Sequence, residues 1–214
     1  MLEKRLKPPS TIIYTIDKIL IMSDKSKKSK KAPTEEQATG LRELLVDSVK
    51  DLYWAEQAIT EALPEMIENA TSEELSEALK NHLEETKTQV ERLEEVFGLL
   101  NEPPEAKECA AMKGILKEGA EIIKHTASGY VRDAGIIAAG QKVEHYEIAS
   151  YGTIIAFAKT LGETEAAGIL QLTLDEEKLA DDKLSEIAEL SVNVEAAGDE
   201  ADDSTLEEIA ETNT

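Results

Sequence analysis

The chain has little of what disulfide-linked, zinc-binding and sheet-based proteins need. Its 214 residues include one cysteine, Cys109, so no disulfide can form within the chain and no cysteine cluster can hold zinc or an iron–sulfur centre. We therefore expect a reducing, cytoplasmic compartment. Aromatic residues make up only 4% of the chain, whereas Ala, Leu, Glu, Lys and Ile are plentiful. This mixture favours helices over strands and predicts an all-α protein.

Long hydrophobic runs are also absent. The best candidate, residues 11–22, is interrupted by Asp17 and Lys18 and is too short to cross a bilayer. No small-residue cleavage site follows it, so we expect neither a membrane span nor a signal peptide. Met22 is an alternative start, which would leave residues 1–21 untranslated.

Basic residues are scarce and unevenly placed. The formal net charge is −22, with 23 Lys and Arg against 45 Asp and Glu, and many of the bases lie in residues 1–31. A surface this negative repels phosphate, so nucleic acid is not an expected partner. We expect a disordered basic leader (1–39), a folded helical domain (40–190) and a disordered acidic tail (191–214).

Apolar residues at helical spacing predict four long helices and one shorter helix. The expected ranges are 41–68, 74–100, 105–126 for the shorter one, 131–160 and 164–190. Thr71 and Glu74 form a candidate capping box, and Gly162 is expected to end the fourth helix. Short connections make antiparallel hairpins of the first and last pairs of long helices, while the middle connection is long enough to cross the bundle. The predicted fold is a ferritin-like antiparallel four-helix bundle with an additional short helix in that connection.

Acidic residues interrupt the apolar face of each long helix. Glu56, Glu147 and Glu177 stand in otherwise apolar rows, and Glu85 lies one turn from His82 and from Gln89. Each of these glutamates is within about two residues of its helix midpoint, or roughly 3 Å along the axis. We therefore expect four carboxylates to meet in one layer of the bundle.

Buried carboxylates need compensation by cations, by protonation or by basic partners. No Lys or Arg occupies the inward positions, so oxygen-preferring divalent ions, iron or manganese, are the favoured explanation. The candidate metal ligands are Glu56, Glu85, Glu144, Glu147, Glu177, His82, Gln89 and Asp181.

Other roles stay open for several of these residues. Any one glutamate could face water, and Glu144 could be a ligand or a flanking surface residue. His82 could bind a metal, orient a ligand or pack in the core. Tyr53, Tyr146 and Tyr151 could lie near the site or only pack, and His145 is expected to play a supporting or packing role.

Several strings carry a family resemblance. They are DLYWAEQ (51–57), HLEETKTQVERLEEVF (82–97), CAAMKG (109–114), LDEEKLADDKL (174–184) and, most specifically, KVEHYEIASYGT (142–153). Over about residues 40–190 the chain resembles the YciE/YciF family of ferritin-like stress-response proteins. The resemblance implies a cytoplasmic homodimer linked to stress.

The sequence departs from the wider ferritin-like pattern, in which two helices offer Glu-x-x-His. Thr88 and Ala180 stand where those histidines would be. Our leading hypothesis is a stress-defence protein that binds iron or manganese and acts on peroxide or Fe(II), without catalytic residues assigned. The alternative is a metal-free helical dimer, a structural or interaction module whose central glutamates are protonated or bridged by water.

Overall fold

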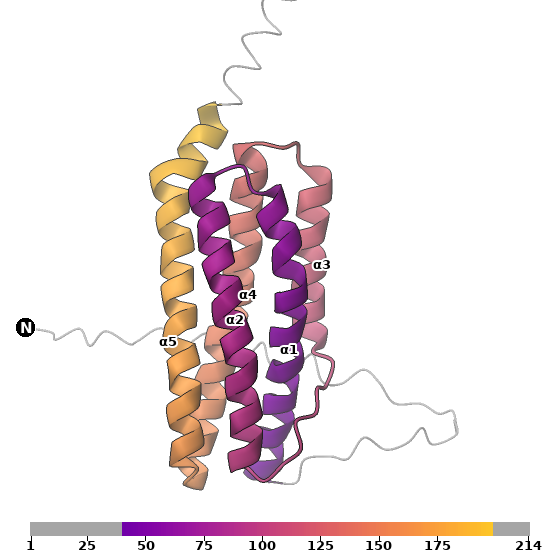
Figure 1. Ribbon diagram of the computed structural model, residues 1–214, viewed down its shortest axis with the longest axis vertical. Helices are drawn as coiled ribbons and strands as arrows, with labels where there is room; N and C mark the ends of the chain where they lie inside the picture. Colours follow the sequence, from indigo (N-terminus) through magenta and orange to yellow (C-terminus); the bar gives the residue numbers. More distant parts are fainter. Residues whose placement is uncertain (1–39, 199–214) are drawn as a thin grey trace, which may run out of the picture. The chain divides into compact units, whose positions relative to one another are not determined.

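A computed structural model describes residues 40–198, and these residues form a bundle of helices packed side by side (Figure 1). The helices are α1 (Leu41–Asn69), α2 (Glu73–Leu99), α3 (Ala110–His125), α4 (Tyr130–Leu161) and α5 (Thr164–Ile187), followed by a π-helical turn, Ala188–Val192. Within residues 40–198 there is no strand. The predicted all-α, ferritin-like architecture with an additional short helix is confirmed.

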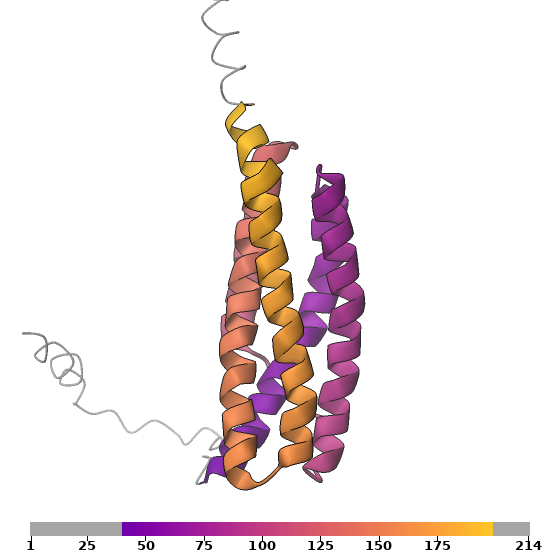
Figure 2. The ribbon, with the colours of Figure 1, turned by 90° about the vertical axis from the view of Figure 1, so that its left-hand side faces the viewer.

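The long helices form two antiparallel hairpins, α1–α2 and α4–α5, because only a few residues join the members of each pair. Figure 2 shows α5 in front, between α4 and α2, while Figure 1 shows α3 outside the four-helix core beside α1. Gly162 ends α4 as predicted: it adopts the left-handed conformation (φ 83°), and its amide donates to the carbonyl of Lys159 at 3.2 Å.

The turn between α1 and α2 differs from the prediction. Ser72, rather than Thr71, caps α2, and its hydroxyl accepts from the amide of Leu75 at 3.3 Å. Thr71 instead belongs to the turn, where its amide donates to Asp133 Oδ1 at 2.8 Å, and the amide of Ser72 donates to Oδ2 at 2.7 Å. Because Asp133 is buried on α4, these two bonds join one end of the first hairpin to the second.

The connection from α2 to α3 also differs, since α3 begins at Ala110 and not near residue 105. Residues 102–109 run without regular structure along α1. The amide of Lys107 donates to the carbonyl of Lys50 at 3.1 Å, and Lys50 Nζ pairs with Glu105 Oε2 at 2.6 Å. Cys109 caps α3 by accepting from the amide of Met112, so the segment's polar groups bond across to α1 rather than within a helical turn.

Two apolar clusters fill the bundle, one toward each end. The first combines the start of α1 and α5 with the ends of α2 and α4, around Leu52, Phe97 and Ile154. The second combines the opposite halves of these helices with α3, around Ile59 and Ile136. The buried polar residues Glu56, His82, Thr86, Gln89, Glu144, Glu147, Thr173 and Glu177 come from the helix segments between them.

The bundle continues beyond the predicted boundary at residue 190. Helical structure extends to residue 198, and Val192 is buried because it packs with the second apolar cluster. The predicted basic leader (1–39) and residues 199–214 of the predicted tail lie outside the described residues. Within the described part, no helix is long and apolar enough to cross a membrane.

Candidate metal centre

Four buried side chains from three helices converge in the polar layer. They are His82 of α2, Glu144 and Glu147 of α4, and Glu177 of α5, and one potential ligand atom from each lies within 4.8 Å of the others. Glu144 and Glu147 point to the same side because residues three apart share a helix face. The layer therefore contains a set of oxygen and nitrogen atoms close enough to surround an ion.

Glu56 brings a carboxylate from α1 to the same layer. It is fully buried, and its Oε1 accepts a hydrogen bond from the hydroxyl of Tyr151 on α4. Burial, followed by the negative charge of Glu177, raises the pKa of Glu56 from 4.5 to about 8. The bond from Tyr151 acts in the opposite direction, because it stabilises the ionised carboxylate.

The other three glutamates are perturbed in the same direction. Burial is the largest cause of the raised pKa of Glu144, Glu147 and Glu177. For Glu144 and Glu147, the charges of neighbouring carboxylates add to the increase. The layer therefore disfavours several ionised carboxylates at once unless a positive charge is added.

Hydrogen bonds within the described residues leave much of this layer unsatisfied. Nine buried side-chain atoms have no hydrogen-bond partner, and all except Arg132 Nε belong to the layer. The eight are Glu56 Oε2, His82 Nδ1 and Nε2, Gln89 Oε1, Glu144 Oε2, Glu147 Oε1 and Oε2, and Glu177 Oε2. Because buried polar atoms normally have partners, so many in one place mark the layer as a candidate ligand site.

The donor set also has a definite chemical preference. Carboxylate oxygens outnumber the single imidazole, and no thiol is present among the converging side chains. Oxygen-rich sites with one imidazole suit hard or borderline divalent ions such as manganese and iron, whereas copper(I) prefers sulfur ligands. The residues present therefore fit the metal predicted from the sequence.

A polar network fixes Glu177 from the α2 side. Gln89 Nε2 donates to Glu177 Oε1 and, at 3.2 Å, to Glu176 Oε2. Arg92 closes the network through a two-point ion pair with Glu176, with Nη2 and Oε1 at 2.7 Å. The sequence analysis did not identify Arg92 or Glu176. Their signal was weak: Arg92 follows Gln89 by one helical turn, and Glu176 directly precedes Glu177.

The predicted position of Glu85 in the buried layer is wrong. Its side chain is half exposed, and its Oε2 lies 3.9 Å from His82 Nδ1. The inward positions of α2 are instead occupied by His82, Thr86 and Gln89. Glu85 directly precedes Thr86 and lies on the flank of this face, so α2 contributes an imidazole at the level where we expected a carboxylate.

Asp181 lies at the edge of the layer and has other partners. Its Oδ2 is 3.1 Å from His145 Nε2, and its Oδ1 accepts from Gln141 Nε2 at 3.4 Å. The His145 side chain is mostly exposed. Asp181 is therefore outside the set of converging ligand atoms, and His145 contacts it without reaching the layer.

The structure also places the other residues whose roles the sequence left open. Glu144 and His82 are both buried in the layer, with His82 Nε2 3.5 Å from Glu144 Oε1. Of the three tyrosines, Tyr151 bonds to Glu56, whereas Tyr146 donates to Asp51 at 2.6 Å and Tyr53 donates to Glu94 at 2.7 Å. Tyr151 is thus the tyrosine among them that bonds to a glutamate of the layer.

The chain is similar to proteins of known sequence and structure. Protein YciF of Escherichia coli (strain K12) is 43% identical over 157 residues, which span 73% of this chain and 95% of that protein. The crystal structure of the E. coli stress protein YciF matches with a TM-score of 0.70 and 42% identity, covering 73% of this chain and 99% of the other.

Two further structures have the same fold. YcfI from Rhodopseudomonas palustris matches with a TM-score of 0.68 and 47% identity, over 69% of this chain and 94% of that chain. A protein from Xanthomonas campestris pv. campestris matches with a TM-score of 0.60 and 24% identity, over 75% of this chain and 99% of that chain. At this identity the match supports the fold alone. The model of the domain of unknown function DUF892 matches residues 40–197. The chain therefore belongs to the DUF892 family and is a relative of YciF.

Proposed function

We propose that this protein binds iron or manganese in the polar layer of a ferritin-like bundle. One observation carries the proposal: eight buried polar atoms without hydrogen-bond partners come from residues of one layer. A divalent ion would satisfy the glutamate oxygens and one ring nitrogen of His82, and would offset the cost of ionising adjacent buried carboxylates. Protonation of the carboxylates alone would offset the charge but would leave both ring nitrogens of His82 without a partner, whereas an ion would bind one of them.

The proposed ligands are Glu56, Glu144, Glu147, Glu177 and His82. Tyr151 holds Glu56, and Gln89 holds Glu177, so both side chains orient ligands from outside the ion's reach. The apolar clusters close the layer toward the two ends of the bundle. A bound iron or manganese ion would supply redox and Lewis-acid chemistry there.

A role in stress defence is the physiological part of the proposal. The E. coli relative is described as a stress protein. An iron or manganese site of this kind is suited to removing peroxide or oxidising Fe(II), and we propose one of these as the protein's activity. We further propose that the protein acts as a homodimer in the cytoplasm, where reduced Cys109 is stable.

Metal analysis tests the binding. The full chain is purified without chelator, analysed for metals, stripped and then titrated with Mn²⁺, or with Fe(II) under anaerobic conditions. We expect stoichiometric binding that is weakened by Glu147→Gln, whereas Glu95→Gln, at an exposed position of α2, leaves it unchanged. Admitting air to the Fe(II)-loaded protein and recording absorbance then tests for oxidation. Substoichiometric binding by the unaltered protein would contradict the proposal.

The second candidate is a metal-free helical scaffold that serves as a structural or interaction module. The raised pKa of Glu56, about 8, favours it, because a carboxyl with that pKa is largely protonated at neutral pH. The two candidates differ in their response to chelation. A metal-free scaffold would keep its melting temperature after chelator treatment and on addition of Mn²⁺, whereas the metal-binding protein is stabilised by the ion.

A further inference from the structure

A cavity of about 470 Å³ opens between α2 and α5. Two of the residues that line it, His82 and Glu144, are also members of the buried layer. The other lining residues come from α2 and α5, toward the second apolar cluster. The cavity therefore joins the surface of the bundle to the proposed metal centre at these two side chains.

With Glu144, His82 is one of the two polar side chains at the inner wall. Its side chain is about nine-tenths buried, and neither ring nitrogen has a hydrogen-bond partner among the described residues. Nδ1 lies 3.9 Å from Glu85 Oε2, and Nε2 lies 3.5 Å from Glu144 Oε1. The imidazole thus stands between a half-exposed carboxylate and a buried one, and Glu85 also lines the cavity.

The outer part of the cavity has a negative charge. Glu74, Glu77 and Glu85 line it together with one base, Lys183, which bonds to Glu74 at 2.9 Å and to Glu186 at 3.0 Å. Within the described part of the chain, no lysine or arginine pairs with Glu77 or Glu85. The remaining walls include Ala78, Leu79, Leu179 and Leu184. Apolar walls focus the field of such charges and concentrate cations in the opening.

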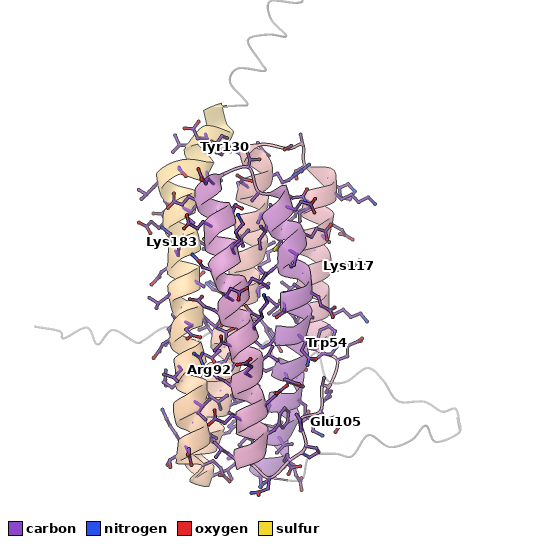
Figure 3. The ribbon with its side chains drawn as sticks, in the orientation of Figure 1. Trp54, Arg92, Glu105, Lys117, Tyr130 and Lys183 are labelled. Atoms are coloured by element: carbon purple, nitrogen blue, oxygen red, sulfur yellow. The ribbon has the colours of Figure 1, made fainter. Side chains whose placement is uncertain are left out.

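The same α2–α5 face is closed nearer its other end. Arg92 and Glu176 pair there across the two helices, and Gln89 lies beneath them against Glu177. Figure 3 shows Arg92 and Lys183 at different heights of the bundle. A cation approaching at the Arg92 end meets a guanidinium. One approaching at the Lys183 end meets Glu77 and Glu85, which pair with no lysine or arginine among the described residues, beside a Lys183 that is bonded to Glu74 and Glu186.

We infer that this cavity is the port through which a divalent cation reaches the buried layer. Glu77 and Glu85 attract the ion, and Glu85 passes it to His82 and Glu144, which form the inner end of the port. The inference rests on the proposed metal binding and adds the route. It assigns Glu85, outside the layer, a role in the rate of uptake and not in the final coordination.

Stopped-flow uptake of Co²⁺ by the metal-free full chain measures this rate, because cobalt coordinated by imidazole and carboxylate absorbs in the visible range. At low salt we expect the Glu77→Gln, Glu85→Gln double variant to take up Co²⁺ about tenfold more slowly, with unchanged final occupancy. Lys183→Gln, which removes a positive charge at the port, should accelerate uptake. Raising the salt concentration should slow the unaltered protein more than the double variant.

Two further variants separate the port from general effects of charge. Glu84→Gln also removes a negative charge from α2, but Glu84 does not line the cavity and pairs with Lys87 at 2.6 Å. This variant should leave the rate of uptake nearly unchanged. Ala180→Trp, at a half-buried lining position, should obstruct the port and slow uptake at every salt concentration.

The outcomes are distinct. Uptake by the double variant at the rate of the unaltered protein, with the same salt dependence, would overturn the port while leaving the metal centre intact. A slowing no greater than that caused by Glu84→Gln would do the same. No Co²⁺ binding by the unaltered protein would instead overturn the proposed function together with the port.

Discussion

The hydroxyl of Tyr151, on α4, donates a hydrogen bond to Oε1 of Glu56, on α1, and both side chains are fully buried. This bond favours the ionised form of Glu56, in a layer where burial and neighbouring carboxylates disfavour it. The pair therefore connects the apolar cluster around Leu52, to which Tyr151 belongs, with the proposed metal ligands. Its removal should act on metal binding without emptying a ligand position.

Tyr151→Phe should weaken Mn²⁺ binding by about 10–100-fold, because loss of a ligand's hydrogen-bond partner typically has an effect of this size. Titration of the metal-free protein measures it. The control is Tyr53→Phe, which removes a hydroxyl–glutamate bond of 2.7 Å at a position outside the layer. Equal affinities for the two variants would show that the Tyr151 hydroxyl does not orient a ligand.

The metal-free protein should lose stability as the pH rises from about 4.5 to 8. The folded-state pKa of Glu56 is raised to about 8, so the folded state binds more protons than the unfolded state throughout this interval. The stability that Glu56 contributes is therefore fully present below its unfolded-state pKa. It is lost as the pH rises through its folded-state pKa. Urea unfolding at pH 5.5 and 8.0, with chelator, should differ by a few kcal/mol.

Glu56→Gln tests the origin of this pH dependence. The variant has no carboxyl to titrate at this position, so its stability should vary less between pH 5.5 and 8.0. Saturating Mn²⁺ should also reduce the loss in the unaltered protein, because ion binding to the folded state favours the ionised ligands. A metal-free protein that is more stable at pH 8.0 than at pH 5.5 would contradict the assigned cause.

Glu147→Gln should stabilise the metal-free protein at pH 8 while weakening metal binding. Burial and neighbouring carboxylates raise the pKa of Glu147, so folding at pH 8 must either protonate this carboxyl or bury its charge. The amide of glutamine is similar in size and avoids both costs. We expect the melting temperature with chelator to rise by about 2–4 °C for each kcal/mol gained. With Mn²⁺ the order should reverse. Destabilisation of the variant both with and without metal would indicate a purely structural role.

Gly135→Ala should destabilise the bundle by about 1–3 kcal/mol, independently of metal. A Cβ at this position of α4 would lie 2.5 Å from Ile122 Cγ2, so α3 would have to move. Gly152, on the same helix, has open space around it, and Gly152→Ala should stabilise by about 0.5–1 kcal/mol through helix propensity. Denaturant unfolding of both variants with chelator checks the pair, and equal effects would refute close α3–α4 packing.

Helical periodicity was sufficient to predict the fold. The apolar residues of each long helix repeat at intervals of three and four, and the buried positions follow this pattern. The short link at Gly162 and the long one before α3 then set the connectivity. Helix ends were less predictable: Ser72 and Thr71 are equally good caps by residue type, and the choice depends on Asp133, which approaches from α4.

The candidate site was predictable only in part. Glu56, Glu147 and Glu177 stand in apolar rows, so their burial could be read from the sequence. Glu85 was predicted wrongly because residue number gives the height of a residue along the helix axis but not the direction of its side chain. A residue at the edge of the buried face can point toward the core or toward solvent. The contacts of Tyr151 and Arg92 join different helices, and no spacing within one helix indicates them.

The hydrophobic interior is divided into two halves, so the residues of the layer between them can be exchanged without changing either half. Leu52 and Ile59 flank Glu56 along α1 and belong to different halves, each with its own contacts to the neighbouring helices. Exchanging the acidic residues between them for uncharged ones of similar size should remove electrostatic cost and leave the contacts within each half in place. We therefore expect redesign of the central layer to alter ligand binding while the helical scaffold keeps its architecture.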